Sequence, residues 1–321
     1  MTTHWSEYWK LGHVTSFGTD YKENYTGQLK DLWSDIFSQF STGFKVLDVA
    51  TGNGALPLLI QDYFSKLSID GEVKGVDYAD INMAPLTSSH HNKNVVIELL
   101  GNTPAESLPF PDCEFDTVIS QFGIEYSDLI ISMPEVLRVL KDGGIFHAVI
   151  HHQKSVVICY NSKLLSFLQH PEIERVVFLL KMMAHDMGEM TDRQDLIRIK
   201  SCAKCEKSRI EINDLLSKLA VYDEESLSES GVLKYINDFF INGLFWSVEK
   251  KLEYLVFVSE QISVYRQRLT ELVAASMSVE RIDSLREVLR QNAVITFSVE
   301  EVVNNTGDIL GWYFSFSKHS F

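Results

Sequence analysis

The sequence predicts an α/β fold in which a doubly wound, mostly parallel sheet is interrupted by a large helical insertion. Three observations along the 321 residues support this prediction. Short apolar runs alternate with helical stretches over residues 44–152, which is typical of parallel strands joined by crossover helices. Residues 161–291 then have an almost wholly helical pattern. In the tail, a turn at 304–308 joins two β-branched and aromatic runs into an expected hairpin.

Strand-like patterns occur before and after the helical block, at 44–50, 72–77, 95–100, 116–120, 144–152, 293–303 and 310–318. A helix is expected over 55–67, with Pro57 in its first turn, where the missing N–H of proline costs nothing. Another is expected at 133–141, ended by the glycines of 142–144. We therefore divide the chain into three parts. An N-terminal helical and aromatic cap covers 1–43, a discontinuous sheet domain covers 44–152 and 292–321, and a helical insertion covers 153–291.

The charge and composition exclude several classes of protein. The chain carries 29 basic and 44 acidic residues, a formal net charge of −15, which argues against general attraction to nucleic acid or an anionic membrane. No window approaches the roughly 18 to 20 apolar residues that span a bilayer, and the N-terminus lacks the pattern of a signal peptide. The four cysteines are too scattered for a disulfide framework. We expect a cytoplasmic protein, and a homo-oligomer is compatible with the sequence.

A loop with two glycines, Thr51-Gly52-Asn53-Gly54, lies between the first strand and the helix after it. Doubly wound sheets bind nucleotides at this position, and glycine lets the backbone approach a ligand closely. Asp77 ends the second strand 23 residues after Gly54, a spacing at which a carboxylate binds the hydroxyls of a ribose. The pattern therefore predicts an adenosine-type ligand.

Two details distinguish between adenosine ligands. A dinucleotide fingerprint requires a third glycine three residues after Gly54, but Pro57 stands there. Asp48 ends the strand that leads into the loop, and a carboxylate at this point repels a pyrophosphate and attracts an ammonium or a sulfonium. A cationic nucleoside therefore fits better than a dinucleotide. The alternative for the whole pattern is an ordinary turn beside an acidic helix cap.

Three stretches in this order resemble the class I S-adenosylmethionine-dependent methyltransferases, in particular the branch of the ubiquinone/menaquinone C-methyltransferases. They are residues 46–54, 75–78 and 105–123, and the resemblance covers about residues 44–152. The terminal hairpin matches the antiparallel strand pair that closes this family's seven-stranded, Rossmann-like sheet. The resemblance implies an enzyme that uses S-adenosylmethionine and releases S-adenosylhomocysteine.

The resemblance also implies roles for individual residues. Asp48, Gly52 and Gly54 would surround the methionine part of the cofactor, and Thr51 and Asn53 would add loop contacts. Many relatives have an aspartate shortly before the adenine contacts, where this chain has Gly101-Asn-Thr-Pro104. The remaining contacts that the resemblance implies are Asp77 on the ribose, Tyr78 against the adenine, Ala105 and Glu106 at the adenine edge, and Gln121 and Phe122 at the end of the fourth strand.

The N-terminal segment is rich in aromatic residues: Trp5, Tyr8, Trp9, Phe17, Tyr21, Tyr25 and Trp33. In the family a segment in this position often folds over the cofactor. Phe17 or Tyr25 would then meet the sulfonium through cation–π attraction. Packing of the segment onto the sheet is an equal alternative.

Two histidines, His151 and His152, close the fifth strand at the same edge of the sheet as the loop. An imidazole there would remove a proton from the acceptor during methyl transfer, and at most one of two neighbours points toward the site. A structural histidine is an equal alternative. Glu125 and Tyr126, just beyond the fourth strand, are weaker candidates for the base.

Two further motifs have ordinary explanations. Cys202-Ala-Lys-Cys205 has the spacing of half a zinc knuckle or of a redox motif, but no second pair exists, so unpaired thiols and no metal are expected. A basic stretch could receive an anionic acceptor or RNA, although a solvated helix face is the more frequent meaning of such a run. It contains Arg193, Arg198, Lys200, Lys204, Lys207 and Arg209.

The sequence thus predicts an S-adenosylmethionine-dependent methyltransferase whose helical insertion covers a small, partly apolar acceptor. Catalysis is expected from alignment of the acceptor with the methyl group and from exclusion of water. The alternatives are an RNA or protein methyltransferase and a non-catalytic cofactor-binding protein. The acceptor and the atom that is methylated do not follow from the sequence.

Overall fold

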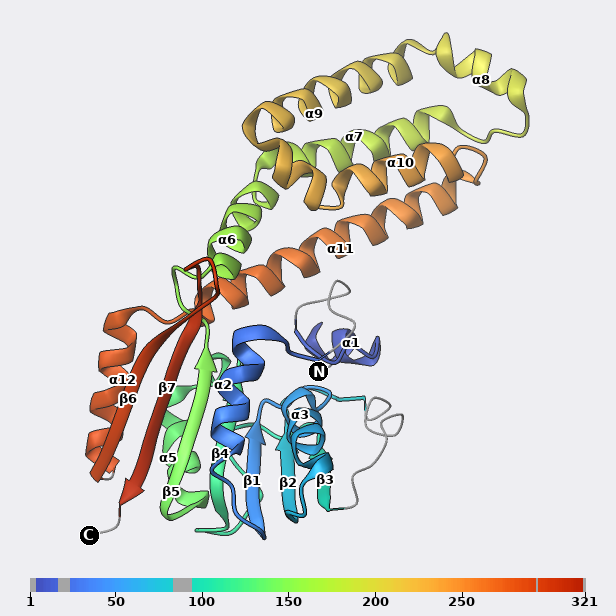
Figure 1. The fold of residues 1–321 in the computed structure, drawn as a ribbon. Helices are drawn as coiled ribbons and strands as arrows, with labels where there is room; N and C mark the ends of the chain where they lie inside the picture. Colours follow the sequence, from blue (N-terminus) through green and yellow to red (C-terminus); the bar gives the residue numbers. More distant parts are fainter. Residues whose placement is uncertain (1–3, 17–23, 83–93, 293, 320–321) are drawn as a thin grey trace. The chain divides into compact units, whose positions relative to one another are not determined.

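The computed structural model describes residues 4–16, 24–82, 94–292 and 294–319. The chain divides into two compact units. One consists of Met1–Ile158 and Ala274–Phe321 and contains the sheet; the other is Cys159–Val273 and is helical (Figure 1).

Among the described residues, the sheet unit contains seven strands in the order β3-β2-β1-β4-β5-β7-β6. Strands β1 to β5 are parallel, and β7 pairs antiparallel with both β5 and β6. This confirms the predicted doubly wound, mostly parallel sheet with an antiparallel C-terminal hairpin. The strands are β1 (Phe44–Val49), β2 (Gly71–Val76), β3 (Val95–Leu100), β4 (Phe115–Gln121), β5 (Leu140–Ile150), β6 (Val294–Val303) and β7 (Ile309–His319).

Helices cover both faces of the sheet because successive residues of a buried parallel strand point to opposite faces. In β1, Val46 packs with α2 and α3 on one face, whereas Leu47 packs with α5 and α12 on the other. The helical elements of this unit are α1 (His4–Lys10), α2 (Gly27–Phe37), α3 (Ala55–Tyr63), η2 (Phe64–Lys66), η3 (Ile124–Tyr126), α5 (Leu129–Val139) and α12 (Val279–Asn292).

The helix expected at 133–141 is wrong at both ends. It begins at Leu129, because the Asp128 side chain caps it by accepting a hydrogen bond from the Ile130 N–H at 3.0 Å. It ends at Val139, and β5 begins at the next residue. The glycines of 142–144 therefore lie inside a strand, where the register between β4 and β5 shifts, and they do not stop a helix.

The helical unit has its own apolar core. Chain segments enter and leave it through α6 (Val156–Leu168) and α11 (Val248–Ala275), each of which continues across a unit boundary. The helices between them are α7 (Pro171–Met187), α8 (Arg193–Lys200), α9 (Ala203–Glu229) and α10 (Val232–Asn242). Their buried side chains, such as Phe167, Leu180 and Phe239, form one cluster.

The segment predicted as an insertion, 153–291, is longer than this unit. Helix α12 belongs to the sheet unit, where Ile282, Leu285 and Leu289 are buried against α5 and the sheet. Within the described part of the chain, no helix is both long and apolar enough to cross a membrane.

Candidate functional site

The loop after β1 is held in a form that few sequences allow. Ala50 and Gly52 have positive φ values of 59° and 54°. The Thr51 N–H donates to the Val76 carbonyl at 2.9 Å, which fixes the loop to the end of β2. A Cβ atom on Gly123, after β4, would lie 2.4 Å from Cβ of Ala50, so this close approach of two loops requires glycine.

Asp48 is a buried carboxylate with one oxygen left over. Its side chain is 2% exposed, and Oδ2 accepts a hydrogen bond from the Thr51 hydroxyl at 2.6 Å. Oδ1 is buried and has no hydrogen-bond partner. Burial raises the pKa of Asp48 to about 8, against the effect of the Thr51 hydrogen bond. A cation bound at Oδ1 would favour the ionised form of Asp48 and so offset the effect of burial on its pKa.

Asp77 comes directly after β2 and connects two loops. Its Oδ2 accepts from the Gly52 N–H at 2.7 Å, and its Oδ1 accepts from the Ala79 N–H at 2.8 Å. Burial raises the pKa of Asp77 to about 6, although both backbone hydrogen bonds lower it. A carboxylate oxygen can accept more than one hydrogen bond, so Asp77 remains able to bind hydroxyl groups.

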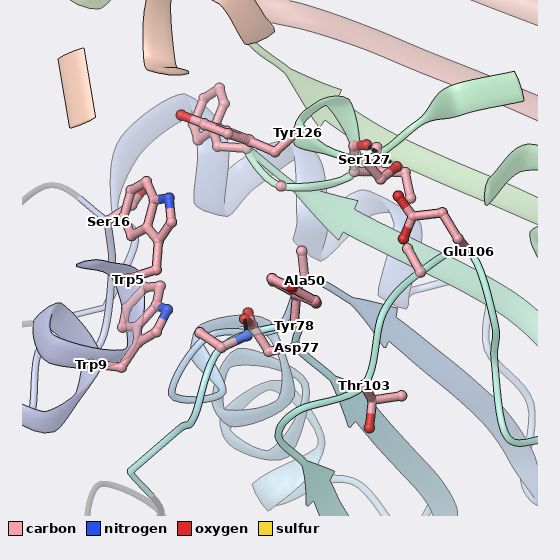
Figure 2. A pocket seen from close by; sticks show the side chains of 15 residues that line it. Trp5, Trp9, Ser16, Ala50, Asp77, Tyr78, Thr103, Glu106, Tyr126 and Ser127 are labelled. Carbon is pink, nitrogen blue, oxygen red and sulfur yellow. Dashed lines mark hydrogen bonds between the residues drawn. The ribbon is translucent and has the colours of Figure 1, made fainter. Parts of the chain in front are cut away.

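A main cavity of about 460 Å³ lies beside these acids, at the carboxyl end of the parallel strands. Figure 2 shows Trp5 and Trp9 on one side of it and Glu106 and Ser127 on the other. Its volume is in the range of small-molecule and cofactor sites. The lining residues are Trp5, Trp9, Ser16, Ala50, Asp77, Tyr78, Ala79, Thr103, Ala105, Glu106, Phe122, Gly123, Ile124, Tyr126 and Ser127.

A small cavity of about 30 Å³ shares Trp9, Ser16, Ala50 and Phe122 with the main cavity. Its other lining residues are Val14, Tyr25, Asp48, Thr51, Gly52, Ala55, Leu56 and Gln121.

Gln121 presents an amide donor in this small cavity. Its Oε1 accepts a hydrogen bond from the Trp33 indole N–H, and because an indole can only donate, this bond fixes which way the amide points. Nε2 makes no hydrogen bond of normal geometry, and Tyr25 lies beside it and interacts with Gln121. Gln121 Nε2 and Asp48 Oδ1 thus place an available donor and an available acceptor around one cavity.

The N-terminal segment closes one side of the site. Asn53 holds this segment, because its Nδ2 donates to the carbonyls of Trp9 at 2.9 Å and His13 at 2.7 Å. The Trp9 indole lies directly over Gly52, where a Cβ atom would be only 2.6 Å from its ring. Trp5 stacks on Trp9 with ring centroids 6.0 Å apart. The aromatic density of the segment is plain in the sequence, but Trp5 and Trp9 were not predicted as site residues.

Neither candidate histidine lines the main cavity. Strand β5 ends at Ile150, so both residues come after it. His151 stacks on Phe122, with ring centroids 4.5 Å apart, and burial lowers its pKa to about 3. His152 lies on the other side, 4.3 Å from the Trp312 ring and with Nε2 3.5 Å from Glu301. The pair points to opposite sides, as expected, with Phe122 between His151 and the cavity wall.

Of the two weaker candidates for the base, Glu125 and Tyr126, only Tyr126 lines the main cavity. It also meets the edge of Trp5 at 5.9 Å. Glu125 is 3% exposed and accepts from the His151 backbone N–H at 2.8 Å, which gives it a structural contact. Burial raises the pKa of Glu125 to about 7.

The structure thus brings most of the predicted cofactor residues together. Asn53 and Gly54 line neither cavity, since Asn53 is used to hold the N-terminal segment and Gly54 caps α3. Phe17 lies outside the described residues. Those on the main cavity are Asp77, Tyr78, Ala105, Glu106 and Phe122, and those on the small cavity are Tyr25, Asp48, Thr51, Gly52, Gln121 and Phe122.

The two remaining sequence motifs lie in the helical unit. In the basic stretch, Arg198 pairs with Asp195 at 3.2 Å and Arg209 pairs with Glu206, so part of its charge is neutralised within its own helices. All four cysteines are free thiols. Among the described residues, no group of three or more His, Cys, Asp or Glu side chains is arranged to hold a metal ion.

Comparison with known sequences identifies the family. Residues 6–198 match the ubiE/COQ5 methyltransferase family, and this is more than half of the chain. The chain belongs to the ubiE/COQ5 methyltransferase family. The match includes the N-terminal helix, the glycine loop and strands β1 to β5.

Individual relatives are similar over part of their length. The UbiE ubiquinone/menaquinone biosynthesis C-methyltransferase of Geobacter sulfurreducens is 32% identical over 139 residues, which is 42% of this chain and 49% of that protein. The chloroplastic 2-phytyl-1,4-beta-naphthoquinone methyltransferase of Arabidopsis thaliana is 30% identical over 46% of this chain and 55% of its own. The demethylmenaquinone methyltransferase of Bacillus licheniformis is 34% identical over 35% and 48%. The chain spans about half the length of these relatives.

Proposed function

We propose that this protein binds S-adenosylmethionine and transfers its methyl group to a small, partly apolar acceptor. The observation that carries the proposal is the buried Asp48 Oδ1, which has no partner, on the same small cavity as the amide of Gln121 and beside the loop of a methyltransferase-family sheet. The amino-acid end of S-adenosylmethionine carries one ammonium and one carboxylate. The Asp48 oxygen would accept from the ammonium, and the Gln121 amide would donate to the carboxylate. A dinucleotide would place its negatively charged pyrophosphate at this loop, where the Asp48 carboxylate repels it.

The remaining residues fit the nucleoside part of the cofactor. Asp77 would accept hydrogen bonds from the ribose hydroxyls, and its contacts with the Gly52 and Ala79 N–H groups hold it in place for this. Tyr78 and Ala105 would border the adenine. The three side chains line the main cavity, whose volume suits a bound nucleoside.

The small cavity is too small, as it stands, to hold the amino-acid end of the cofactor. A volume of about 30 Å³ holds roughly one water molecule. Trp9 and Ser16 of the N-terminal segment line it, so we expect this segment to shift when the cofactor binds. The Asn53 hydrogen bonds would then limit how far the segment moves.

The mechanism needs little chemical activation. When bound, S-adenosylmethionine would supply a methyl group on a positively charged sulfur. The acceptor atom bonds to the methyl carbon as the carbon–sulfur bond opposite it breaks, and S-adenosylhomocysteine leaves. The chain would contribute position and exclusion of water: Asp48 and Asp77 anchor the donor, and the rings of Trp5, Phe122 and Tyr126 surround the acceptor side. A base is required only where the acceptor loses a proton.

The acceptor is proposed to be a ring of the quinone class. Relatives are named for ubiquinone, menaquinone and naphthoquinone substrates. Aromatic walls in the main cavity would pack against a flat ring in offset or edge-on geometry. The helical unit remains our proposed cover for such an acceptor. Neither His151 nor His152 lies on the wall of the main cavity, so we propose structural roles for both.

The test combines binding with turnover. The purified protein is first titrated with S-adenosylmethionine, and then metabolites are compared between cells with and without the gene. We expect an accumulated precursor that is one methyl group lighter than a missing product, and conversion of that precursor by the purified protein. Tight cofactor binding without any transfer would instead favour a non-catalytic role.

A further inference from the structure

The cysteine pair Cys202 and Cys205 lies at the start of a long helix in the helical unit. Cys202 is the N-cap residue of α9, with an extended backbone, and Cys205 lies in the first turn. Cys202 is partly exposed, whereas Cys205 is 1% exposed and belongs to the apolar core of the unit. One thiol is therefore open to reagents and the other is screened.

Helix spacing places the two cysteines on the same side at the start of α9. Residues three apart on a helix are neighbours, with Cβ atoms about 5 to 6 Å apart, and a disulfide requires about 3.5 to 4.5 Å. Each thiol shifts the pKa of the other, since the Cys205 thiol lowers that of Cys202 and the Cys202 thiol raises that of Cys205. A small change of rotamer or backbone would therefore allow an S–S bond.

The surroundings give the two thiols opposite properties. The backbone of Cys205, in the first turn of α9, is the main cause that lowers the pKa of the Cys202 thiol. Burial raises the pKa of Cys205 to about 11. Asp186 on α7 opposes ionisation of both thiols, and Arg198 on α8 favours ionisation of Cys205. Cys202 is thus the better nucleophile, and Cys205 is the resolving thiol.

We propose that Cys202 and Cys205 form a thiol–disulfide exchange site that reacts with low-molecular-weight disulfides. The Cys202 thiolate attacks one sulfur of the external disulfide, whose S–S bond breaks and releases one thiol. The sulfur of Cys205, after losing its proton, then attacks Cys202 and releases the second thiol. The protein loses two electrons and two protons, which the external disulfide gains. An external dithiol reverses the reaction.

The chain contains its own controls for this site. Cys113 and Cys159 are exposed thiols outside the pair. Replacing both with serine leaves only Cys202 and Cys205, and a variant with Cys159 alone supplies an exposed helical thiol as a reference. Each variant is made in the full chain, and circular dichroism confirms its helical content.

The experiment treats these proteins with glutathione disulfide and measures intact mass and free thiols over time. The pair is expected to lose two hydrogens, with no free thiol left. With Cys205→Ser, or with the apolar Cys205→Ala if serine disturbs the core, a stable glutathione adduct is expected on Cys202. Cys202 should react about tenfold faster than Cys159, because its surroundings lower the pKa of the Cys202 thiol. Cys202→Ser should leave Cys205 almost unmodified.

Three results would overturn the proposal: equal reaction rates for Cys202 and Cys159, no internal disulfide in the protein that keeps both thiols, or stoichiometric zinc that protects both from glutathione disulfide. None of these outcomes depends on methyl transfer. Failure of this site and failure of the proposed function are therefore distinguishable.

Discussion

The acidic residues at the carboxyl ends of β1 and β2 line cavities, whereas the two histidines after β5 are not on the wall of the main cavity. Asp48 and Asp77 lie against cavities, and Asp48 keeps one oxygen without a partner. His151 and His152 stand at the same edge of the sheet, yet neither lines the main cavity. Both ends carry a pair of ionisable residues directly at or after a buried strand.

The difference comes from the chain segments and side chains next to each strand end. After β1 the chain turns through Ala50 and Gly52 with positive φ, and the buried carboxylates of Asp48 and Asp77 line cavities beside this turn. After β5 the Phe122 ring covers His151, and Trp312 covers His152. Position at the end of a strand therefore selects candidates, but side-chain packing decides which of them can touch a ligand.

The largest effect is expected for Asp77→Ala. This change removes the acceptor of two ribose hydroxyls, and hydrogen bonds to a charged group contribute about 1.5 to 3 kcal/mol each, so affinity for S-adenosylmethionine should fall at least about 100-fold. Titration calorimetry measures it. Asp80→Ala is the matched control, since Asp80 is an exposed acid three residues further on. Equal affinity in the Asp77 variant and the control would remove the ribose assignment.

A smaller effect is expected for Gln121→Glu. The variant keeps an acceptor for the Trp33 indole, but it replaces the Nε2 donor with a negative oxygen beside Asp48. Loss of one charge-assisted hydrogen bond and the added repulsion should weaken cofactor binding by about thirtyfold. Gln39→Glu, at an exposed position, adds the same charge away from the cavity. If both variants bind alike, the amino-acid end does not lie at Gln121.

Asp48→Asn should weaken binding by about tenfold and change the pH dependence of stability. The pKa of Asp48 is about 8 in the folded protein and 3.8 ordinarily, so between pH 4 and pH 8 the folded state binds the extra proton. Stability of the unliganded protein therefore falls as pH rises through that window, by at most about 1.4 kcal/mol per pH unit from this group.

The asparagine variant lacks this contribution. It should become more stable than the wild-type protein as pH rises from 4 to 8, with no further gain above pH 8. Denaturant unfolding at several pH values measures the difference, and titratable groups that do not interact with Asp48 contribute equally to both proteins. A difference that does not change with pH would show that Asp48 is ionised in the unliganded protein.

The smallest effect on turnover is expected at the histidines. His152→Gln should change kcat by less than about threefold, and His151→Gln should mainly reduce stability, because it loses a ring stack worth about 1 kcal/mol. With its pKa near 3, His151 should also leave no inflection in kcat between pH 5 and pH 8. A catalytic base would instead cost about 100-fold or more in kcat at unchanged cofactor affinity.

Much of the fold could be predicted from periodicity and turn residues. The strand at 95–100 agrees with β3 at both ends, and the terminal hairpin lies where it was expected. Gly143 and Gly144 misled the prediction, since an irregular strand pairing and a helix stop both use glycine. Only the pairing of β5 with β4 shows that these glycines lie inside a strand, and this pairing cannot be read from the local sequence.

The site could be predicted in part. Asp48, Asp77 and the loop could be placed from spacing along the chain, because strand order brings them together. The role of Asn53 could not be predicted, since its partners Trp9 and His13 are about forty positions away and are set by tertiary packing. For the same reason, the sequence could not show that Trp5 and Trp9 line the cavity or that Phe122 separates His151 from it.

The most direct measurement is a calorimetric titration with S-adenosylmethionine at pH 7, repeated in two buffers that differ in ionisation enthalpy. If a positive group pairs with Asp48, ionisation of that carboxyl accompanies binding, and the wild-type protein should release about one proton while Asp48→Asn releases none. An excess of NAD should leave both titrations unchanged. Binding without proton release, or displacement of S-adenosylmethionine by NAD, would contradict the account.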